Sequence, residues 1–354
     1  MGSTVEQASP APDRQRLVGI DLARGLALLG MLAVNLRLAM GVAAEPGAPL
    51  AALFLALEGR SAALFVCLAG LGLGLVTARL SPDKALGQTW RRALFLAIVG
   101  LLHLSVFPAD ILHYYGAYFF LGGLLLSWPR RRLGALALAM PLLYLALLFQ
   151  FDYSKGWNWA TLDYVDLWTL PGFVRHLLFN GLHPILPWLS FFIWGLLLAG
   201  SPLTERRWQH RLIGGGLAGF ALSLALHAVL LKQFPAAAGL LSTKPLPPGP
   251  LYVFSAAALS SALIGLMLRF GTSLQRPLHA LAQLGRCTLS LYLAHVLIGM
   301  GILEAIGWLD GQRSLADVAL AWAVFVVAAL LGTRLWLARF AQGPVEMLMR
   351  RCCG

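Results

Sequence analysis

Charged residues are scarce in this chain. Asp, Glu, Lys and Arg together make up 12% of its 354 residues, whereas they make up about 25% of a soluble domain. Hydrophobic residues make up 59%. The longest stretch that leans polar, residues 152–184, is too short to form a core of its own. The composition therefore excludes a soluble domain and predicts a polytopic membrane protein.

Cysteine is scarce too, and it occurs only as Cys67, Cys287, Cys352 and Cys353. No spacing of Cys and His resembles a zinc site, and the last two cysteines are predicted to be cytoplasmic, where a stable disulfide is not expected. The P-loop, the GxSxG elbow, the HExxH motif and the dinucleotide-binding glycine fingerprint are absent as well. We therefore predict no metal, and we expect any chemistry to rest on His and carboxylate side chains at membrane depth.

Long apolar runs make up most of the chain. They cover residues 17–42, 61–79, 92–107, 111–127, 133–150, 185–200, 211–232, 251–269, 287–308 and 316–338. Because a spanning helix needs about 20 residues, the third, fourth and sixth runs are short for a full crossing. The pattern predicts an all-α bundle of about ten transmembrane helices with both termini cytoplasmic. It divides the chain into a disordered cytoplasmic tail (1–16), one transmembrane domain (17–342) and a cytoplasmic C-terminal tail (343–354).

The net charge of +12 is distributed according to the side of the membrane. With the N-terminus inside and the helices alternating, 20 of the 27 Lys and Arg residues fall on the inner side and 7 on the outer side. The positive-inside rule describes this asymmetry, so the excess charge indicates topology and not a nucleic-acid partner. We predict a multi-pass protein of a bacterial cytoplasmic (inner) membrane, with membrane lipid as a partner and a homodimer left open.

Three polar residues interrupt the first apolar run. At 100° per residue, Asp21, Arg24 and Asn35 fall near one stripe of a helix. Asp21 and Arg24 are three apart and can pair, which indicates either a structural ion pair or a site for an anionic ligand that enters from the cytoplasm. No charged residue lies near Asn35 in the sequence except Arg37, so we expect Asn35 to line a cavity. An ionisable group in hydrocarbon costs several kcal/mol unless it is paired or faces water.

The turn between the third and fourth runs gathers candidate catalytic groups. Asp110, His113 and Tyr114 have the three- and four-residue spacing of one helical face. A carboxylate beside an imidazole fixes its tautomer and raises its basicity, as a general base requires. His103, before Pro108, could face the same outer vestibule. The alternative is that Asp110 caps the fourth helix and that His113 is an interfacial histidine.

Two more histidines and one arginine are candidates. His183 precedes Pro184 at the predicted start of the sixth helix and would lie at the outer face. His295 lies near mid-membrane in the ninth helix, on one face with Tyr292, and a buried neutral histidine bonded to Tyr or Ser is the alternative interpretation. Arg286 begins that helix on the basic inner side. We group Asp21, Arg24, Arg286 and His295 as candidates for binding a cofactor or donor substrate.

The chain resembles the YeiB-like bacterial membrane proteins, which are related to the heparan-alpha-glucosaminide N-acetyltransferase family and to other transmembrane acyltransferases. The resemblance covers nearly the whole chain. The segments that carry it are residues 16–35, Glu58-Gly-Arg60, Gly70-Leu-Gly72, Asp110-Ile-Leu-His113-Tyr-Tyr-Gly116, His183-Pro-Ile-Leu-Pro-Trp188 with Gly195, Gly285-Arg286 with Leu289-Ser-Leu-Tyr292, and Trp336 with Phe340 and Gly343-Pro-Val-Glu346.

The resemblance implies acyl transfer within the membrane. It implies acetyl-CoA, or another acyl-CoA, as a donor used from the cytoplasmic side, and a sugar amine as the acceptor on the other side. In the family, an Asn of the first helix and a nearby His are associated with the active site. Asn35 matches the Asn, whereas residues 36–60 contain no His. The role of that His would have to pass to His103, His113 or His183, or be lost.

The sequence thus predicts a membrane-embedded acyltransferase with a small-molecule or glycan acceptor that offers a hydroxyl or an amine. Asp110 would orient His113, and that imidazole or a neighbouring one would deprotonate the acceptor, while Asn35 or Tyr114 would support the developing oxyanion. The rival hypothesis is a transporter of a small solute or lipid through the bundle. The lack of an evident internal repeat counts against transport. A non-catalytic scaffold is a third hypothesis, and the number of titratable groups at membrane depth argues against it.

Overall fold

A computed structural model describes residues 17–45 and 47–354. The predicted disordered tail, residues 1–16, lies outside the described residues. The described chain is helical almost throughout, and its strands are two residues long each. The prediction of an all-α bundle is confirmed in this respect.

Fifteen α-helices, three short helical turns and two strands follow one another along the described chain. In the first half they are α1 (Val18–Ala39), α2 (Pro49–Leu57), α3 (Arg60–Thr77), α4 (Pro82–Leu104), α5 (Leu112–Leu125), α6 (Arg130–Leu148), β1 (Trp157–Asn158), β2 (Asp163–Tyr164), α7 (Leu170–Arg175) and the π-helical turn η1 (His176–Asn180). In the second half they are α8 (Ile185–Ala199), α9 (Arg206–Gln233), η2 (Pro235–Ala237), α10 (Pro250–Phe270), α11 (His279–Leu284), α12 (Thr288–Ala294), the π-helical turn η3 (His295–Met300), α13 (Gly301–Ala305), α14 (Leu315–Leu337) and α15 (Pro344–Cys353).

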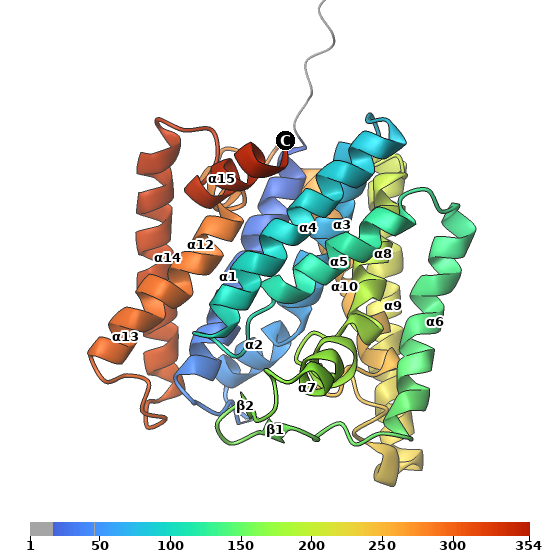
Figure 1. Cartoon of the computed structure of the whole chain (residues 1–354), viewed down its shortest axis with the longest axis vertical. Helices are drawn as coiled ribbons and strands as arrows, with labels where there is room; N and C mark the ends of the chain where they lie inside the picture. The colour runs from blue at the N-terminus through green and yellow to red at the C-terminus, as the bar shows by residue number, and fades with distance from the viewer. Residues whose placement is uncertain (1–16, 46) are drawn as a thin grey trace, which may run out of the picture.

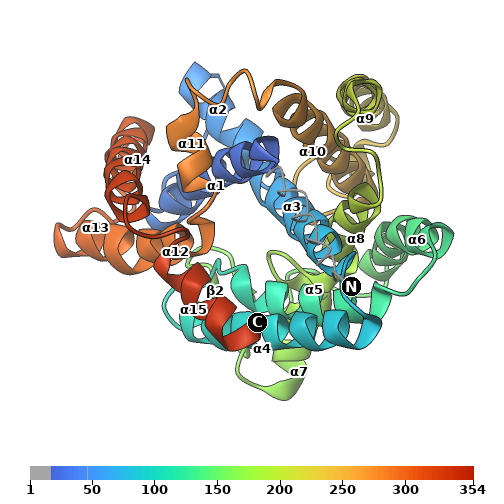
Figure 2. The same cartoon turned by 90° about the horizontal axis from the view of Figure 1, so that it is seen from above.

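The long helices run roughly parallel to one another and give the molecule two distinct ends (Figure 1). The start of α1 and the C-terminal helix α15 lie at one end, which we call the basic end because Arg-rich turns such as 130–132 begin there. The antiparallel hairpin β1–β2 and helix α7 lie at the other end, which we call the hairpin end. Seen along the bundle, α1 and α3 lie inside a ring formed by the other long helices (Figure 2).

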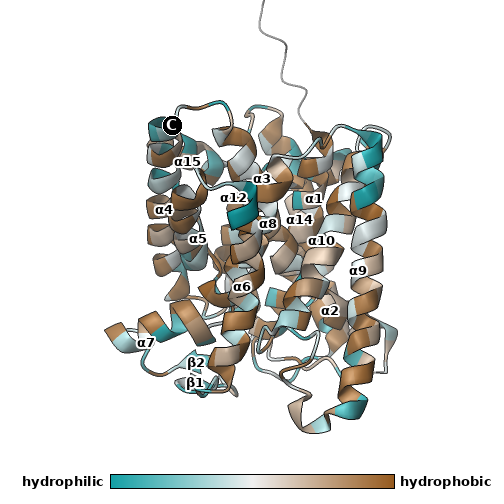
Figure 3. Cartoon of the chain, turned by 90° about the vertical axis from the view of Figure 1, so that its right-hand side faces the viewer, coloured by the Kyte–Doolittle hydropathy of each residue, from teal (hydrophilic) through white to brown (hydrophobic). Residues whose placement is uncertain are grey.

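Apolar residues predominate along the long helices, and polar residues are more frequent towards the two ends of the bundle (Figure 3). Among the described residues, seven helices are long and apolar enough to cross a membrane. There are up to eight if the pair Leu170–Asn180 and Ile185–Ala199, bent by 51°, counts as one span. The chain is therefore a multi-pass membrane protein, but the predicted count of about ten is not reached by this measure.

With that bent pair counted as one span, the two predicted spans that do not meet the criterion are α4 and α5. Helix α4 begins with charged residues, including Asp83, Lys84 and Arg91, which lower its apolar content. Helix α5 has only 14 residues, fewer than the roughly 20 that a full crossing needs. These two helices pack against each other, and the short turn between them holds Asp110.

Glycines allow the helices around this turn to approach closely. A Cβ at Gly100 of α4 would lie 2.1 Å from the backbone nitrogen of His113. A similar contact joins α3 and α8, because a Cβ at Gly195 would lie 2.0 Å from the carbonyl oxygen of Cys67, and one at Gly70 would lie 2.0 Å from that of Phe192. Small residues are the usual means by which membrane helices pack backbone to backbone. The glycines of these motifs thus bring together the helices that carry the candidate residues.

The predicted outer connection, residues 151–184, is folded and not an open loop. We call it the cap. Asn180 lies at its centre and is fully buried: its side chain accepts a hydrogen bond from the Tyr164 hydroxyl at 2.7 Å and donates to the carbonyl groups of Tyr153 (2.9 Å) and Lys155 (2.7 Å). The Trp157 indole N–H donates to the carbonyl of Asn180 at 2.6 Å. The cap therefore covers the hairpin end with its own hydrogen-bonded core.

An ion pair on the surface of the cap joins its two halves. Arg175 donates to the Asp166 carboxylate at 2.6 Å and to the Tyr164 hydroxyl at 2.7 Å. The hydrogen bond from Arg175 lowers the pKa of the Asp166 carboxyl below its ordinary value. Because the carboxylate is exposed, water and salt screen this pair.

The predicted C-terminal tail, residues 343–354, contains helix α15, which packs against α12 and α4 at the basic end. Glu346 of α15 accepts hydrogen bonds from the backbone N–H of Leu289 (2.6 Å) and of Ser290 (3.2 Å), and from the Ser290 hydroxyl (2.5 Å). These are N–H groups at the start of α12, which have no partner within the helix. Glu346 therefore caps a helix that is distant in sequence.

Candidate functional site

The Asp110 carboxylate lies between two imidazoles. Its Oδ1 atom is 2.8 Å from Nδ1 of His103, and its Oδ2 atom is 2.8 Å from Nδ1 of His113 and 3.0 Å from the His113 backbone nitrogen. All three residues are buried, with 0 to 4% of their surface exposed. The Asp110 carboxylate thus accepts hydrogen bonds both from the first turn of α5 and from the His113 ring. The predicted capping contact is therefore present, whereas His113 is buried and not interfacial.

This geometry fixes the protons of both rings. An ionised carboxylate only accepts hydrogen bonds, so Nδ1 of His103 and of His113 must each carry a hydrogen. In a neutral ring the lone pair then lies on Nε2. Both Nε2 atoms are buried, and neither has a hydrogen-bond partner among the described residues. Each ring is therefore arranged as a base whose orientation is set by the shared carboxylate.

Beside His113 lies a second group of rings under the cap. The His113 and His176 rings are nearly parallel, with centroids 5.7 Å apart, and the Tyr114 hydroxyl is 3.1 Å from Nδ1 of His176. The ring centroids of His183 and Tyr114 are 5.9 Å apart, and Nδ1 of His183 is buried without a hydrogen-bond partner among the described residues. We call His103, His113, His176 and His183, with Asp110, the histidine cluster.

His176 was not among the predicted site residues. It lies in the stretch 151–184, which the sequence indicated only as a connection with interfacial aromatics. One signal was available: between Phe173 and Phe179, only Arg175 and His176 interrupt a run of apolar residues. Its position beside His113 depends on the π-helical turn η1, which the sequence pattern does not show.

The Asn35 side chain lies on the other side of the Asp110 turn. Its Nδ2 atom is 3.1 Å from Nε2 of His295, while Nδ1 of His295 donates to the carbonyl of Tyr292. The Tyr292 hydroxyl accepts a hydrogen bond from the backbone N–H of Ile111 at 3.3 Å, and the Tyr292 ring is 5.5 Å from that of His103. Asn35, His295 and Tyr292 thus form a hydrogen-bonded set that adjoins the histidine cluster.

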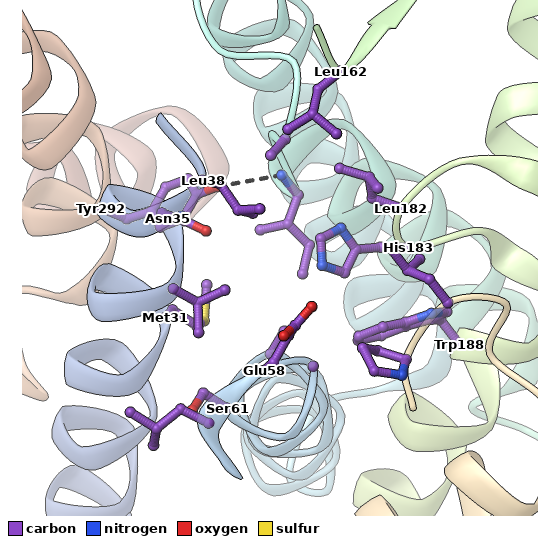
Figure 4. Close-up of a pocket in the computed structure, with 18 of the residues that line it drawn as sticks. Met31, Asn35, Leu38, Glu58, Ser61, Leu162, Leu182, His183, Trp188 and Tyr292 are labelled. Carbon is purple, nitrogen blue, oxygen red and sulfur yellow. Dashed lines mark hydrogen bonds between the residues drawn. The ribbon is translucent and has the colours of Figure 1, made fainter. Parts of the chain in front are cut away.

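A cavity of about 120 Å³ opens between these two groups. Asn35, Glu58, His183, Trp188 and Tyr292 lie around it (Figure 4). Ala109 and Ile111, the residues on either side of Asp110, line it as well. Trp159 and Leu162 of the cap close it at the hairpin end. Trp188 and His183 thus both line the cavity, and the Trp188 indole nitrogen is buried without an acceptor among the described residues.

The predicted donor-binding residues do not all lie together. Asp21 and Arg24 form the predicted ion pair, at 3.7 Å, and Arg24 reaches towards Gly72 of α3. Arg286 donates to the carbonyl of Ala341 at the basic end. The backbone of Asp21 lies against Gly285, the residue before Arg286, so the start of α1 meets the segment that contains Arg286. His295, nine residues after Arg286 in the sequence, lies against Asn35 instead.

Comparison with known proteins identifies the family to which the chain belongs. A family model described as heparan-alpha-glucosaminide N-acetyltransferase, catalytic, matches residues 16–228. The chain belongs to this family. The matched region contains Asn35, the histidine cluster and most residues of the cavity, while Tyr292 and His295 lie beyond it.

A second match covers the rest of the chain. A family model described as a protein of unknown function (DUF418) matches residues 195–353. The uncharacterized protein YeiB of Escherichia coli (strain K12) is 26% identical over 392 residues, which cover 95% of this chain and 96% of that protein. The chain is therefore a YeiB-like member of the heparan-alpha-glucosaminide N-acetyltransferase family, as its motifs indicated.

Proposed function

We propose that this protein is a membrane-embedded acyltransferase. It moves an acyl group, an acetyl group in the first instance, from a cytoplasmic acyl-CoA to a hydroxyl or amine, such as that of a glycan, at the outer face of a bacterial cytoplasmic membrane. The observation that carries the proposal is the shared Asp110 carboxylate with its two oriented imidazoles, next to a cavity lined by Asn35 and His183. The family match favours this reaction over transport of a solute or lipid.

The chemistry requires a base, an oxyanion donor and a leaving-group acid. The histidine cluster supplies the base: it meets the cavity at His183 and is anchored to Asp110 through His113. The acceptor loses its proton to an imidazole while its lone pair attacks the thioester carbon. The new C–O or C–N bond forms, the C–S bond breaks, and the imidazolium returns the proton to the departing thiolate.

The oxyanion that develops on the thioester oxygen needs hydrogen-bond donors that face the cavity. Asn35 and Trp188 both line it, and the Trp188 indole N–H has no acceptor among the described residues. Tyr114, the other predicted donor, is fully buried, is absent from the cavity lining and is bonded to His176. We therefore assign this role to Asn35 and Trp188.

The basic end supplies the entry for the donor. Arg24 and Arg286 both belong to segments that meet there, because the Asp21 backbone lies against Gly285. Their positive charges suit the phosphates of coenzyme A. The predicted inward orientation of this end follows from the asymmetric distribution of Lys and Arg.

The first experiment is a thermal shift of the detergent-purified protein with acetyl-CoA and with free CoA. Binding to the folded state raises the melting temperature by mass action. The second is CoA release from acetyl-CoA, with glucosamine as an amine probe and glycerol as a hydroxyl probe. His113→Gln and His183→Gln are expected to lower turnover about 10²-fold or more, while His279→Gln, an exposed histidine of α11, should leave it unchanged. No shift with millimolar CoA, or full turnover in both variants, would refute the proposal.

A further inference from the structure

A groove separate from the candidate site lies between helices α6, α8, α9 and α10. Its volume is about 640 Å³, and it shares no lining residue with the cavity beside Asn35 and His183. Most of its wall is apolar, with Leu138 and Pro141 of α6 facing the α10 side chains Val253 and Phe254. The acyl-transfer chemistry proposed above makes no use of it.

The groove opens sideways into the membrane. Leu138 is 55% exposed and Phe254 is 58% exposed, although both lie within helices that are apolar enough to span a bilayer. Helices α6 and α9 are the outer elements on this side of the molecule (Figure 3). Side chains exposed at this depth contact hydrocarbon and not water, so a molecule that reaches the groove arrives from the bilayer.

One end of the groove is strongly basic. Arg130 and Arg131 at the start of α6, and Arg211 in the first turns of α9, line it. In residues 17–45 and 47–354 none of the three forms an ion pair with a carboxylate. Arg130 donates to the carbonyl of Leu197 at 2.8 Å, which holds its guanidinium at the groove. The three positive charges therefore remain without a counter-ion from the described chain.

Two uncharged donors in the groove also lack partners. Trp208 lines the groove, and its indole nitrogen is buried with no acceptor among the described residues. Deeper in, Ser190 of α8 is only 4% exposed, and its hydroxyl has no hydrogen-bond partner in the described part of the chain. A buried donor without a partner is costly, so both point to a ligand with acceptor oxygens at two depths.

We infer that this groove binds one anionic phospholipid from the bilayer. The phosphate lies at the basic end against the arginines and Trp208, an ester oxygen accepts from Ser190, and an acyl chain follows the apolar wall past Leu138 and Phe254. Basic pockets between transmembrane helices at the cytoplasmic side are suited to anionic headgroups. The sideways opening favours a lipid over a soluble anion such as coenzyme A, which carries phosphates but enters from water.

A pair of adjacent glycines provides a matched steric test. A Cβ at Gly214 or at Gly215 of α9 would meet nothing within 4 Å, but only Gly215 lines the groove. The protein is incubated with phosphatidylglycerol in detergent and analysed by native mass spectrometry. The wild type and Gly214→Leu should each retain one tightly bound lipid molecule. Retention should fall at least tenfold in Gly215→Leu. Equal retention in the two variants would overturn the inference.

A charge test addresses the headgroup. The double variant Arg131→Gln/Arg211→Gln should lose the preference for phosphatidylglycerol over phosphatidylcholine. The matched double variant is Arg132→Gln/Arg207→Gln. These two arginines are exposed near the starts of the same two helices but do not line the groove, so this variant should keep the preference. Addition of free CoA or inorganic phosphate should not displace the lipid. Displacement by either, or an unchanged preference in the first variant, would contradict a lipid site.

Discussion

Nδ1 of His113 lies 2.8 Å from Oδ2 of Asp110, and the opposite oxygen of the same carboxylate lies 2.8 Å from Nδ1 of His103. One buried acid therefore sets the tautomer of two imidazoles that come from the two helices flanking its turn. Both rings keep an unpartnered Nε2 atom within the described chain. Such an arrangement is costly to bury and gives little stability in return, which is why it points to chemistry.

Asp110→Asn should abolish most activity while the fold persists. The amide keeps the shape of the side chain, but its nitrogen donates hydrogen bonds, so one of the two rings loses its acceptor and must change tautomer. We expect CoA release to fall about 10²–10⁴-fold. Asp163→Asn, an exposed residue of the cap, is the control and should leave the rate unchanged. Wild-type turnover in Asp110→Asn would show that the cluster is structural.

Asn35 and His295 should be energetically coupled. Their side chains are bonded at 3.1 Å in a buried position, and residues that share such a bond show interaction energies of about 0.5–3 kcal/mol. A double-mutant cycle of Asn35→Ala and His295→Ala, measured by thermal unfolding in detergent, tests this. The pair Asn35→Ala and Ser223→Ala, whose hydroxyl bonds within α9, should be additive. Additivity in the first cycle would mean that the bond does not exist.

Gly195→Ala should destabilise the protein by about 1–3 kcal/mol, because an added Cβ would lie 2.0 Å from the Cys67 carbonyl oxygen and forces α8 away from α3. Gly332→Ala, in α14, is the matched control, since nothing lies within 4 Å of its Cβ position. Its melting temperature should stay the same or rise. If both variants melt alike, the close approach of α3 and α8 is not required.

The cap should loosen in acid through Asp166. Arg175 lowers the pKa of this carboxyl in the folded state, so the ion pair adds stability above the unfolded pKa of about 3.9 and loses it as the pH falls through the lower folded value. The protection factors of the amides in residues 151–184, which correct exchange for its intrinsic pH dependence, should therefore fall in this acidic range. High salt at neutral pH should lower them as well, but by less. In Asp166→Asn the exchange should already be faster at neutral pH and should lose this part of its pH dependence. An unchanged acid response would assign it to another group.

The sequence alone determined the class of the protein and several local pairs. Its long apolar runs required a helical membrane bundle, because a helix satisfies its backbone groups within one segment and needs about 20 residues to cross the hydrocarbon. The three-residue spacings of Asp21 with Arg24 and of Asp110 with His113 predicted contacts that the structure confirms, since such pairs depend only on helix geometry.

Only the tertiary structure decided how distant segments meet. The contact of Asn35 with His295 joins residues 260 positions apart, and no local periodicity contains that information. The place of His176 beside His113 depends on the fold of the cap, and the number of full crossings depends on where α4 and α5 begin and end. Long-range packing, and above all the glycine contacts that bring helix backbones together, decided which of the polar side chains share one site.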